Sequence, residues 1–103
     1  MKRSRPNPRN PQRRQKNFAR AYHSSERVQW VQRLPCSLCG RGPSENAHTE
    51  TGGMGRKADY TTIVPLCSPH HRSLHDHGVA PATRTYLREE AVRINALWDK
   101  ETL

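Results

Sequence analysis

The chain is poor in the side chains that build a large core. Only 32% of its 103 residues are hydrophobic, and it has one Phe, two Trp and three Tyr. A small domain with so thin a core usually needs disulfides or a bound metal to remain folded. Its three cysteines cannot all pair with one another. The composition therefore favours a metal site over disulfides, and a reducing cytosol is the expected compartment.

Long apolar segments are also missing from the sequence. It contains no run of 18 apolar residues and no apolar stretch typical of a signal peptide. We therefore expect a cytoplasmic protein that neither spans a membrane nor is secreted. A length of 103 residues predicts one small domain.

Acidic residues are absent from the first 20 positions, which hold eight Lys and Arg. This stretch accounts for nearly all of the net charge of +9. Together with its prolines, the charge predicts a disordered basic tail at residues 1–20 and a folded domain at residues 21–103. We expect the tail, Arg13 and Arg14 included, to bind a polyanion such as DNA with a salt-dependent affinity. The alternative is a leader that only improves solubility.

Metal-ligating residue types are concentrated in the middle of the chain. Two short knuckles, Cys36-Ser-Leu-Cys39 and Cys67-Ser-Pro-His70, are separated by 27 residues. Two such pairs are typical of one tetrahedral structural Zn²⁺. His71 is an alternative fourth ligand, although the C-x₂-H spacing favours His70. Three further imidazoles, those of His48, His71 and His75, then remain for another task.

The pattern of apolar residues and helix breakers predicts the elements around these knuckles. We expect a helix from Ser24 or Ser25 to Leu34, and a strand at 45–49. A glycine-rich loop at 51–60 should follow, and then a strand at 61–64 that Pro65 ends. A helix at 68–77 should end at Gly78. A last helix, starting near residues 81–83, should bury one apolar stripe; Trp30 is also expected in the core. The stripe consists of Leu87, Ala91, Ile94 and Trp98.

In this order the chain resembles the HNH (ββα-metal) endonucleases, in particular small phage and prophage HNH proteins. The resemblance covers residues 24–78. It lies in the two knuckles, in Ala47-His48, in the segment from Gly53 to Asp59 and in the segment from Pro65 to His75. It implies an α+β fold: a small zinc-stapled ββα-metal module flanked by an N-terminal helix and a C-terminal amphipathic helix.

The resemblance also implies a role for each group of candidate residues. His48 would be the general base that takes a proton from water, since an imidazole titrates near neutral pH. His71 and His75, four residues apart on one helix face, would hold a single catalytic Mg²⁺, Mn²⁺ or Ni²⁺. The family's structural zinc would be held by Cys36, Cys39, Cys67 and His70.

The chain departs from the family pattern at two positions. Ala47 stands where many members have a metal-ligating Asp or His, and Thr62 replaces the middle Asn. Asp59 is the nearest carboxylate; it completes the metal shell, orients His48 or caps its own turn. Arg56 and Lys57, beside the loop glycines, are expected to hold a phosphate.

These inferences predict a metal-dependent endonuclease that hydrolyses phosphodiester bonds in DNA, with RNA left open as a substrate. The alternative is a non-catalytic, zinc-stapled nucleic-acid-binding module, which would keep both knuckles and the basic tail without using His48. A third possibility is a zinc scaffold that binds protein partners. The sequence does not indicate an oligomeric state.

Overall fold

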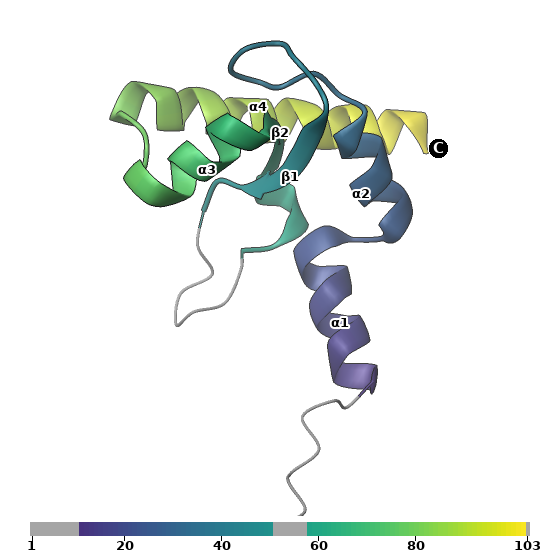
Figure 1. Ribbon diagram of the computed structural model, residues 1–103. Helices are drawn as coiled ribbons and strands as arrows, with labels where there is room; N and C mark the ends of the chain where they lie inside the picture. The colour runs from purple at the N-terminus through teal and green to yellow at the C-terminus, as the bar shows by residue number, and fades with distance from the viewer. Residues whose placement is uncertain (1–10, 51–57, 103) are drawn as a thin grey trace, which may run out of the picture.

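The computed structural model describes residues 11–50 and 58–102. It is a small α+β fold, as expected from the sequence, with helices around a two-stranded antiparallel sheet (Figure 1). No helix in the described ranges combines the length and apolar composition needed to cross a membrane. The elements are α1 (Pro11–Tyr22), α2 (Ser25–Gln32), β1 (Ser44–His48), the 3₁₀ turn η1 (Tyr60–Thr62), β2 (Ile63–Cys67), α3 (Ser68–His77) and α4 (Pro81–Glu101).

Strands β1 and β2 and helix α3 follow one another as a ββα unit. The strands pair with Ser44 opposite Cys67 and His48 opposite Ile63. Helix α3 follows β2 without a loop, has Pro69 in its first turn and ends at Gly78, whose N–H donates to the Leu74 carbonyl. The predicted bounds of this helix are therefore confirmed.

One apolar core joins the sheet to α3 and α4. Helix α4 passes along the sheet in Figure 1 and buries Leu87, Ala91 and Ile94, so the predicted stripe is confirmed at these positions. Trp98 and Trp30 are only partly buried and pack against each other, with ring centroids 5.2 Å apart. The core cluster of buried residues consists of Cys36, Ala47, Val64, Leu66, Leu74, Leu87 and Ala91.

A buried arginine lies beside this aromatic pair. Arg27 of α2 is fully buried, with its guanidinium carbon 5.0 Å from the centre of the Tyr60 ring and 5.8 Å from that of Trp98. One guanidinium nitrogen donates to the side-chain oxygen of Asn95 on α4. The pKa of Arg27 is lowered by burial. Arg27 therefore joins α2, η1 and α4, a role that the helical pattern of the sequence did not indicate.

The second strand differs from its predicted position. Thr61 and Thr62 form the 3₁₀ turn η1 rather than the start of the strand, which begins at Ile63. Pro65 does not end the strand but lies inside it, opposite Asn46. Proline is tolerated in edge strands where its missing N–H does not face the partner. Both strands of a two-stranded sheet are edge strands, so β2 accommodates it.

The predicted disorder of the basic tail is wrong for residues 11–20, which are part of helix α1. The prediction weighed the charge and the prolines of residues 1–20 together. The last of these prolines, Pro11, is the first residue of α1, a position that proline suits. The residues after it are mostly Gln, Arg, Lys and Ala, which favour helices. Residues 1–10 lie outside the described part of the chain.

Candidate metal centre and histidine cluster

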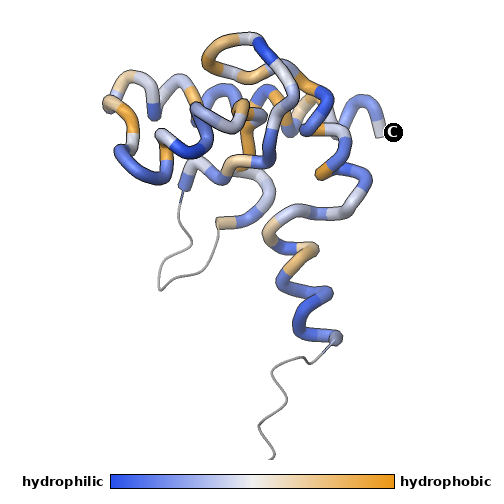
Figure 2. Tube along the Cα trace, in the orientation of Figure 1, coloured by the Kyte–Doolittle hydropathy of each residue, from blue (hydrophilic) through white to orange (hydrophobic). Residues whose placement is uncertain are grey.

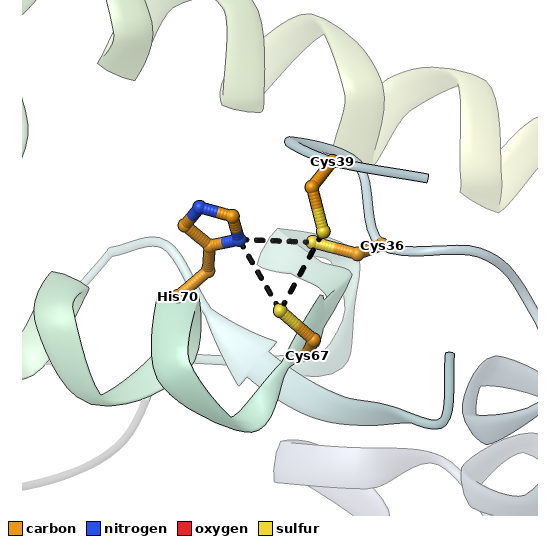
Figure 3. Close-up of side chains that lie close together, drawn as sticks. All are labelled: Cys36, Cys39, Cys67 and His70. Atoms are coloured by element: carbon orange, nitrogen blue, oxygen red, sulfur yellow. Dashed lines mark hydrogen bonds between the residues drawn. The ribbon is translucent and has the colours of Figure 1, made fainter. Parts of the chain in front are cut away.

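Both predicted knuckles come together in the structure. The two cysteines of the first knuckle lie beside Cys67, at the end of β2, and His70, in the first turn of α3 (Figure 3). One potential ligand atom from each of the four residues lies within 4.8 Å of the others. None of the three cysteines forms a disulfide. This Cys₃His cluster could hold a structural metal such as zinc, with Nδ1 as the ligand atom of His70.

The spacing of the ligand atoms fits a tetrahedral zinc ion. A Zn–S bond of about 2.3 Å and a Zn–N bond of about 2.0–2.1 Å give edges of about 3.8 Å between sulfurs and about 3.5 Å between sulfur and nitrogen. The Sγ atoms of Cys39 and Cys67 are 3.7 Å apart. His70 Nδ1 lies 3.5 Å from Cys36 Sγ and 3.2 Å from Cys67 Sγ. The cluster therefore has the size that zinc needs.

Local backbone geometry prepares the first knuckle for a metal. Gly40 has φ +76°, a left-handed conformation that favours glycine, and its N–H donates to the Cys36 carbonyl at 2.8 Å. Burial raises the pKa of the Cys36 thiol, but hydrogen bonds from backbone N–H groups of the two knuckles outweigh it and lower the pKa to about 6. Cys36 is thus favoured as a thiolate, the form that binds metals.

Helix α4 supports the first knuckle through Ser37. The Ser37 hydroxyl donates to Glu90 at 3.1 Å, and the Tyr86 hydroxyl donates to the Ser37 carbonyl at 3.0 Å. The Ser37 N–H donates to the carbonyl of Pro65 in β2 at 2.8 Å. One residue of the knuckle therefore connects the metal site to both the sheet and the closing helix.

A second cluster consists of His71 and His75 of α3 and Glu45 of β1. The Nε2 atoms of His71 and His75 are 3.0 Å apart, and His71 Nδ1 lies 2.7 Å from a carboxylate oxygen of Glu45 in β1. Two imidazoles bound to one cation at about 2.0–2.1 Å in tetrahedral geometry would have their nitrogens about 3.3 Å apart. The two Nε2 atoms are therefore close enough to reach one cation, and 3.0 Å is equally the length of a hydrogen bond between the rings.

Glu45 is a site residue that sequence reasoning missed. Because a carboxylate only accepts hydrogen bonds, His71 donates to it from Nδ1, and in the neutral ring Nε2, which faces His75, then has the lone pair. Metal-ligating histidines are usually oriented by a carboxylate or carbonyl in this way. The only sequence signal was the position of Glu45 three residues before His48, and that signal is weak.

His48 lies on the opposite face of β1 from Glu45. Residues of a strand alternate between its faces, so Glu45 and Ala47 face α3 while Asn46 and His48 face the other way. The Nε2 of His48 lies 2.8 Å from the carbonyl oxygen of Ala21 in α1, and its ring meets the Tyr22 ring edge-on. The structure thus brings His71 and His75 together but places His48 against α1.

The other predicted site residues have different positions. Asp59 caps η1, because its carboxylate accepts hydrogen bonds from the N–H and the hydroxyl of Thr61. This corresponds to the turn-capping alternative. Arg56 and Lys57 lie outside the described residues. Arg13 and Arg14 are exposed on helix α1.

Comparison with known proteins places the chain among relatives of unknown function. Residues 8–86 match a family described as "Protein of unknown function (DUF968)". The chain is also similar to the "Uncharacterized protein YdfU" of Escherichia coli (strain K12), with 40% identity over 57 residues. This similarity covers 52% of the chain and 16% of the relative, so it spans only a small part of that protein's length. No solved structure matches the chain.

Proposed function

This chain belongs to the DUF968 family, and we propose that it is a metal-dependent endonuclease that hydrolyses phosphodiester bonds in DNA. The observation that carries the proposal is the short distance of 3.0 Å between the Nε2 atoms of His71 and His75. The other nitrogen of the His71 ring, Nδ1, contacts the carboxylate of Glu45. The histidine pair lies on the helix of a ββα unit, as the resemblance to HNH endonucleases implies. A chain that needed only a structural zinc would not require it.

The two clusters are suited to different tasks. The Cys₃His cluster supplies four protein ligands, which is typical of a closed structural zinc site. His71 and His75 supply only two and are not fully buried, so a cation held there keeps positions for substrate oxygens and water. Such a divalent cation polarises the phosphate and stabilises the leaving oxygen when bound.

His48 is the proposed general base. Since a carbonyl oxygen only accepts, His48 donates from Nε2 to Ala21, and in the neutral ring Nδ1 then has the lone pair that takes a proton from water. The adjacent Ala47 faces α3. Ala47 and His48 thus lie on opposite faces of β1. In this proposal the scissile phosphodiester lies across the end of β1, with His48 on one side and the histidine pair of α3 on the other.

The proposed substrate follows from charge. The chain has a net charge of +9, and helix α1 contains Arg13, Arg14, Lys16 and Arg20 with no acidic residue. Basic surfaces of this kind bind the phosphate backbone and release counterions. We therefore propose DNA as the partner, and comparison of cleavage of DNA and RNA will decide between the two nucleic acids.

One observation favours a second candidate function. His48 is held against a backbone carbonyl on the side of β1 away from His71, an environment that also suits a structural histidine. A non-catalytic, zinc-stapled nucleic-acid-binding module would have this arrangement. It would bind DNA with the same basic residues and would leave the phosphodiester intact.

A nicking assay with a matched histidine control tests the endonuclease. Zinc-loaded full-length protein is incubated with supercoiled plasmid and Mg²⁺, Mn²⁺ or Ni²⁺, alongside His71→Ala and His77→Ala. His77 is an exposed histidine on the same helix. We expect nicking by the wild type and His77→Ala and strong loss for His71→Ala. A wild type that binds DNA but never nicks it with any of the three cations would instead support the binding module.

A further inference from the structure

We infer that helix α1, which lies outside the ββα unit, positions His48 relative to bound DNA. The inference rests on the proposed function and adds a role for a helix that the resemblance to HNH endonucleases does not cover. In this inference the exposed basic side of α1 binds the DNA backbone. The last turn of α1 contacts the His48 ring. DNA that binds to α1 is therefore also aligned with His48, the proposed general base.

The last turn of α1 meets His48 directly. The Ala21 carbonyl accepts the hydrogen bond from His48 Nε2 at 2.8 Å, and Ala21 itself is only 5% exposed. The Tyr22 ring lies edge-on to the His48 ring, with centroids 5.1 Å apart. A hydrogen bond to one ring nitrogen fixes the tautomer, and the ring contact restricts rotation. Both contacts help to orient Nδ1.

The same turn is anchored to the body of the protein. His23, directly after α1, has φ +73°, and its N–H donates to the Ala19 carbonyl at 2.9 Å, which ends the helix. The His23 ring meets the Tyr60 ring at 5.0 Å and the Trp98 ring at 5.7 Å, both edge-on. A left-handed residue and two ring contacts therefore set the direction in which α1 leaves the body.

The rest of α1 extends from the body and is hydrophilic. Figure 1 shows the helix projecting beyond the sheet, and Figure 2 shows that most of its outer length is hydrophilic. All residues from 11 to 20 are exposed. The four basic residues among them, with no acid, are complementary to a polyanion, and the proposed substrate is one. The occupant we propose for this surface is the DNA backbone.

Helix α1 connects the proposed phosphate contacts to the contact with His48, and this connection should affect the rate of cleavage. When phosphates dock on its basic side, the Ala21 carbonyl and the His48 ring take a fixed position relative to the same strand. Catalysis depends strongly on such positioning of the reacting groups. We therefore expect α1 to influence the rate of cleavage as well as affinity.

Charge neutralisation tests the docking surface. One full-length variant carries Gln at positions 13, 14, 16 and 20. A matched control carries Gln in place of four exposed basic residues elsewhere: Arg33, Arg41, Arg72 and Lys100. Each lost phosphate contact reduces the slope of log K against log[salt] by about 0.9. We expect a smaller slope and at least about tenfold weaker DNA binding at low salt for the α1 variant only. Equal losses in the two variants would overturn the inference.

Substitution of the ring neighbour tests the positioning. Tyr22→Leu removes the ring contact with His48, whereas Tyr22→Phe keeps an aromatic ring at the same position. We expect Tyr22→Leu to lower kcat for nicking about tenfold with DNA affinity unchanged, and Tyr22→Phe to retain kcat near that of the wild type. Equal kcat values for wild type and Tyr22→Leu, with both proteins folded by melting temperature, would overturn the inference.

An NMR measurement separates this inference from the proposed function. The His48 Nε2–H signal of the full-length wild type should be protected from exchange with water, and Tyr22→Leu should speed that exchange. This readout requires no cleavage. If the wild type never nicks DNA, the proposed function fails, and the exchange and binding data still decide whether α1 holds His48. An unprotected Nε2–H in the wild type would refute the role of α1.

Discussion

The carboxylate of Glu45 lies 2.7 Å from Nδ1 of His71 and so joins β1 to the helix that carries the histidine pair. The partner is on the neighbouring element rather than on α3 itself. The geometry of the candidate cation site therefore depends both on the register of the sheet and on the position of α3.

Replacement of Glu45 should weaken cation binding at the histidine pair without disturbing the zinc. Loss of such an outer partner typically costs about 10–100-fold in metal affinity. We expect this decrease for Glu45→Gln in a Ni²⁺ or Co²⁺ titration of the zinc-loaded protein. Glu26→Gln, which changes an exposed carboxylate on α2, is the control. Equal affinities for Glu45→Gln and the wild type would show that the carboxylate does not orient His71.

The alanine variants of the three histidines should differ in how their cleavage activity responds to added cation. His48→Ala removes the proposed general base, so cleavage should fall by about 10²–10⁴-fold at every cation concentration. His71→Ala and His75→Ala remove cation ligands, so raised Mn²⁺ should partly restore their activity. Rates at several Mn²⁺ concentrations, with DNA affinity and zinc content as controls, check this. Rescue of His48→Ala by Mn²⁺ would contradict its assignment as the base.

Loss of a knuckle cysteine should unfold the protein. A structural zinc contributes on the order of 10 kcal/mol to domains of this kind, which is comparable to the ~5–15 kcal/mol net stability of a typical protein. Cys36→Ser and Cys67→Ser should therefore lose most helical circular dichroism, while the exposed Ser73→Ala should not. Metal analysis of folded, chelator-washed wild type should find one zinc per chain; a folded protein without zinc would refute the structural site.

Arg27 should stabilise the fold mainly through its carbon chain and its ring contacts. Its Nε and one terminal nitrogen have no hydrogen-bond partner in the described part of the structure, so burial of the charge is only partly compensated. We expect Arg27→Ala to lower the free energy of unfolding by about 2–4 kcal/mol through lost packing. Arg27→Met should cost less than half as much. Equal costs in urea denaturation would mean that the charge itself is required.

Glu50 provides a test that depends on pH. The hydrogen bond from Arg88 is the main cause that lowers the pKa of Glu50, and burial partly opposes it. A lowered pKa in the folded state stabilises the protein above the unfolded pKa of about 4.3, and the effect disappears as pH falls through the folded value. The pair is partly exposed, so solvent screens the interaction and its contribution to stability should be small.

The measurement compares the free energy of unfolding of the wild type and Arg88→Gln. Their difference should be constant from neutral pH down to about pH 5 and shrink below about pH 4. Arg72→Gln, which changes an exposed arginine on α3, controls for the change in net charge. A difference between wild type and Arg88→Gln that grows toward low pH would contradict the assignment.

The sequence predicted the Cys₃His cluster in full because its information is local. Each knuckle places two ligands within four residues, and the chain has only three cysteines to distribute. The ends of α3 were also predictable, because Pro69 favours the start of a helix and Gly78 favours its end through local backbone conformation. Features that depend on the nearest few residues were therefore predicted correctly.

Features that depend on packing were not predictable in the same way. The partnership of Glu45 with His71 requires the strand register, and the contact between Ala21 and His48 requires the direction of α1. Pro65 was expected to end a strand because the sequence does not reveal that the sheet, in the part of the chain that the structure describes, has two strands. The helix at residues 11–20 was missed because net charge was weighed above helix propensity.

The three hydrogen bonds of Ser37 make the metal knuckle part of one cooperative unit. Because they reach β2 and two positions of α4, loss of a metal from the Cys₃His cluster would loosen an attachment that the sheet and α4 share. A zinc-free chain should then retain no intermediate in which α3 still presents its histidines in register. The amount of zinc bound would set the fraction of molecules that have a histidine site at all.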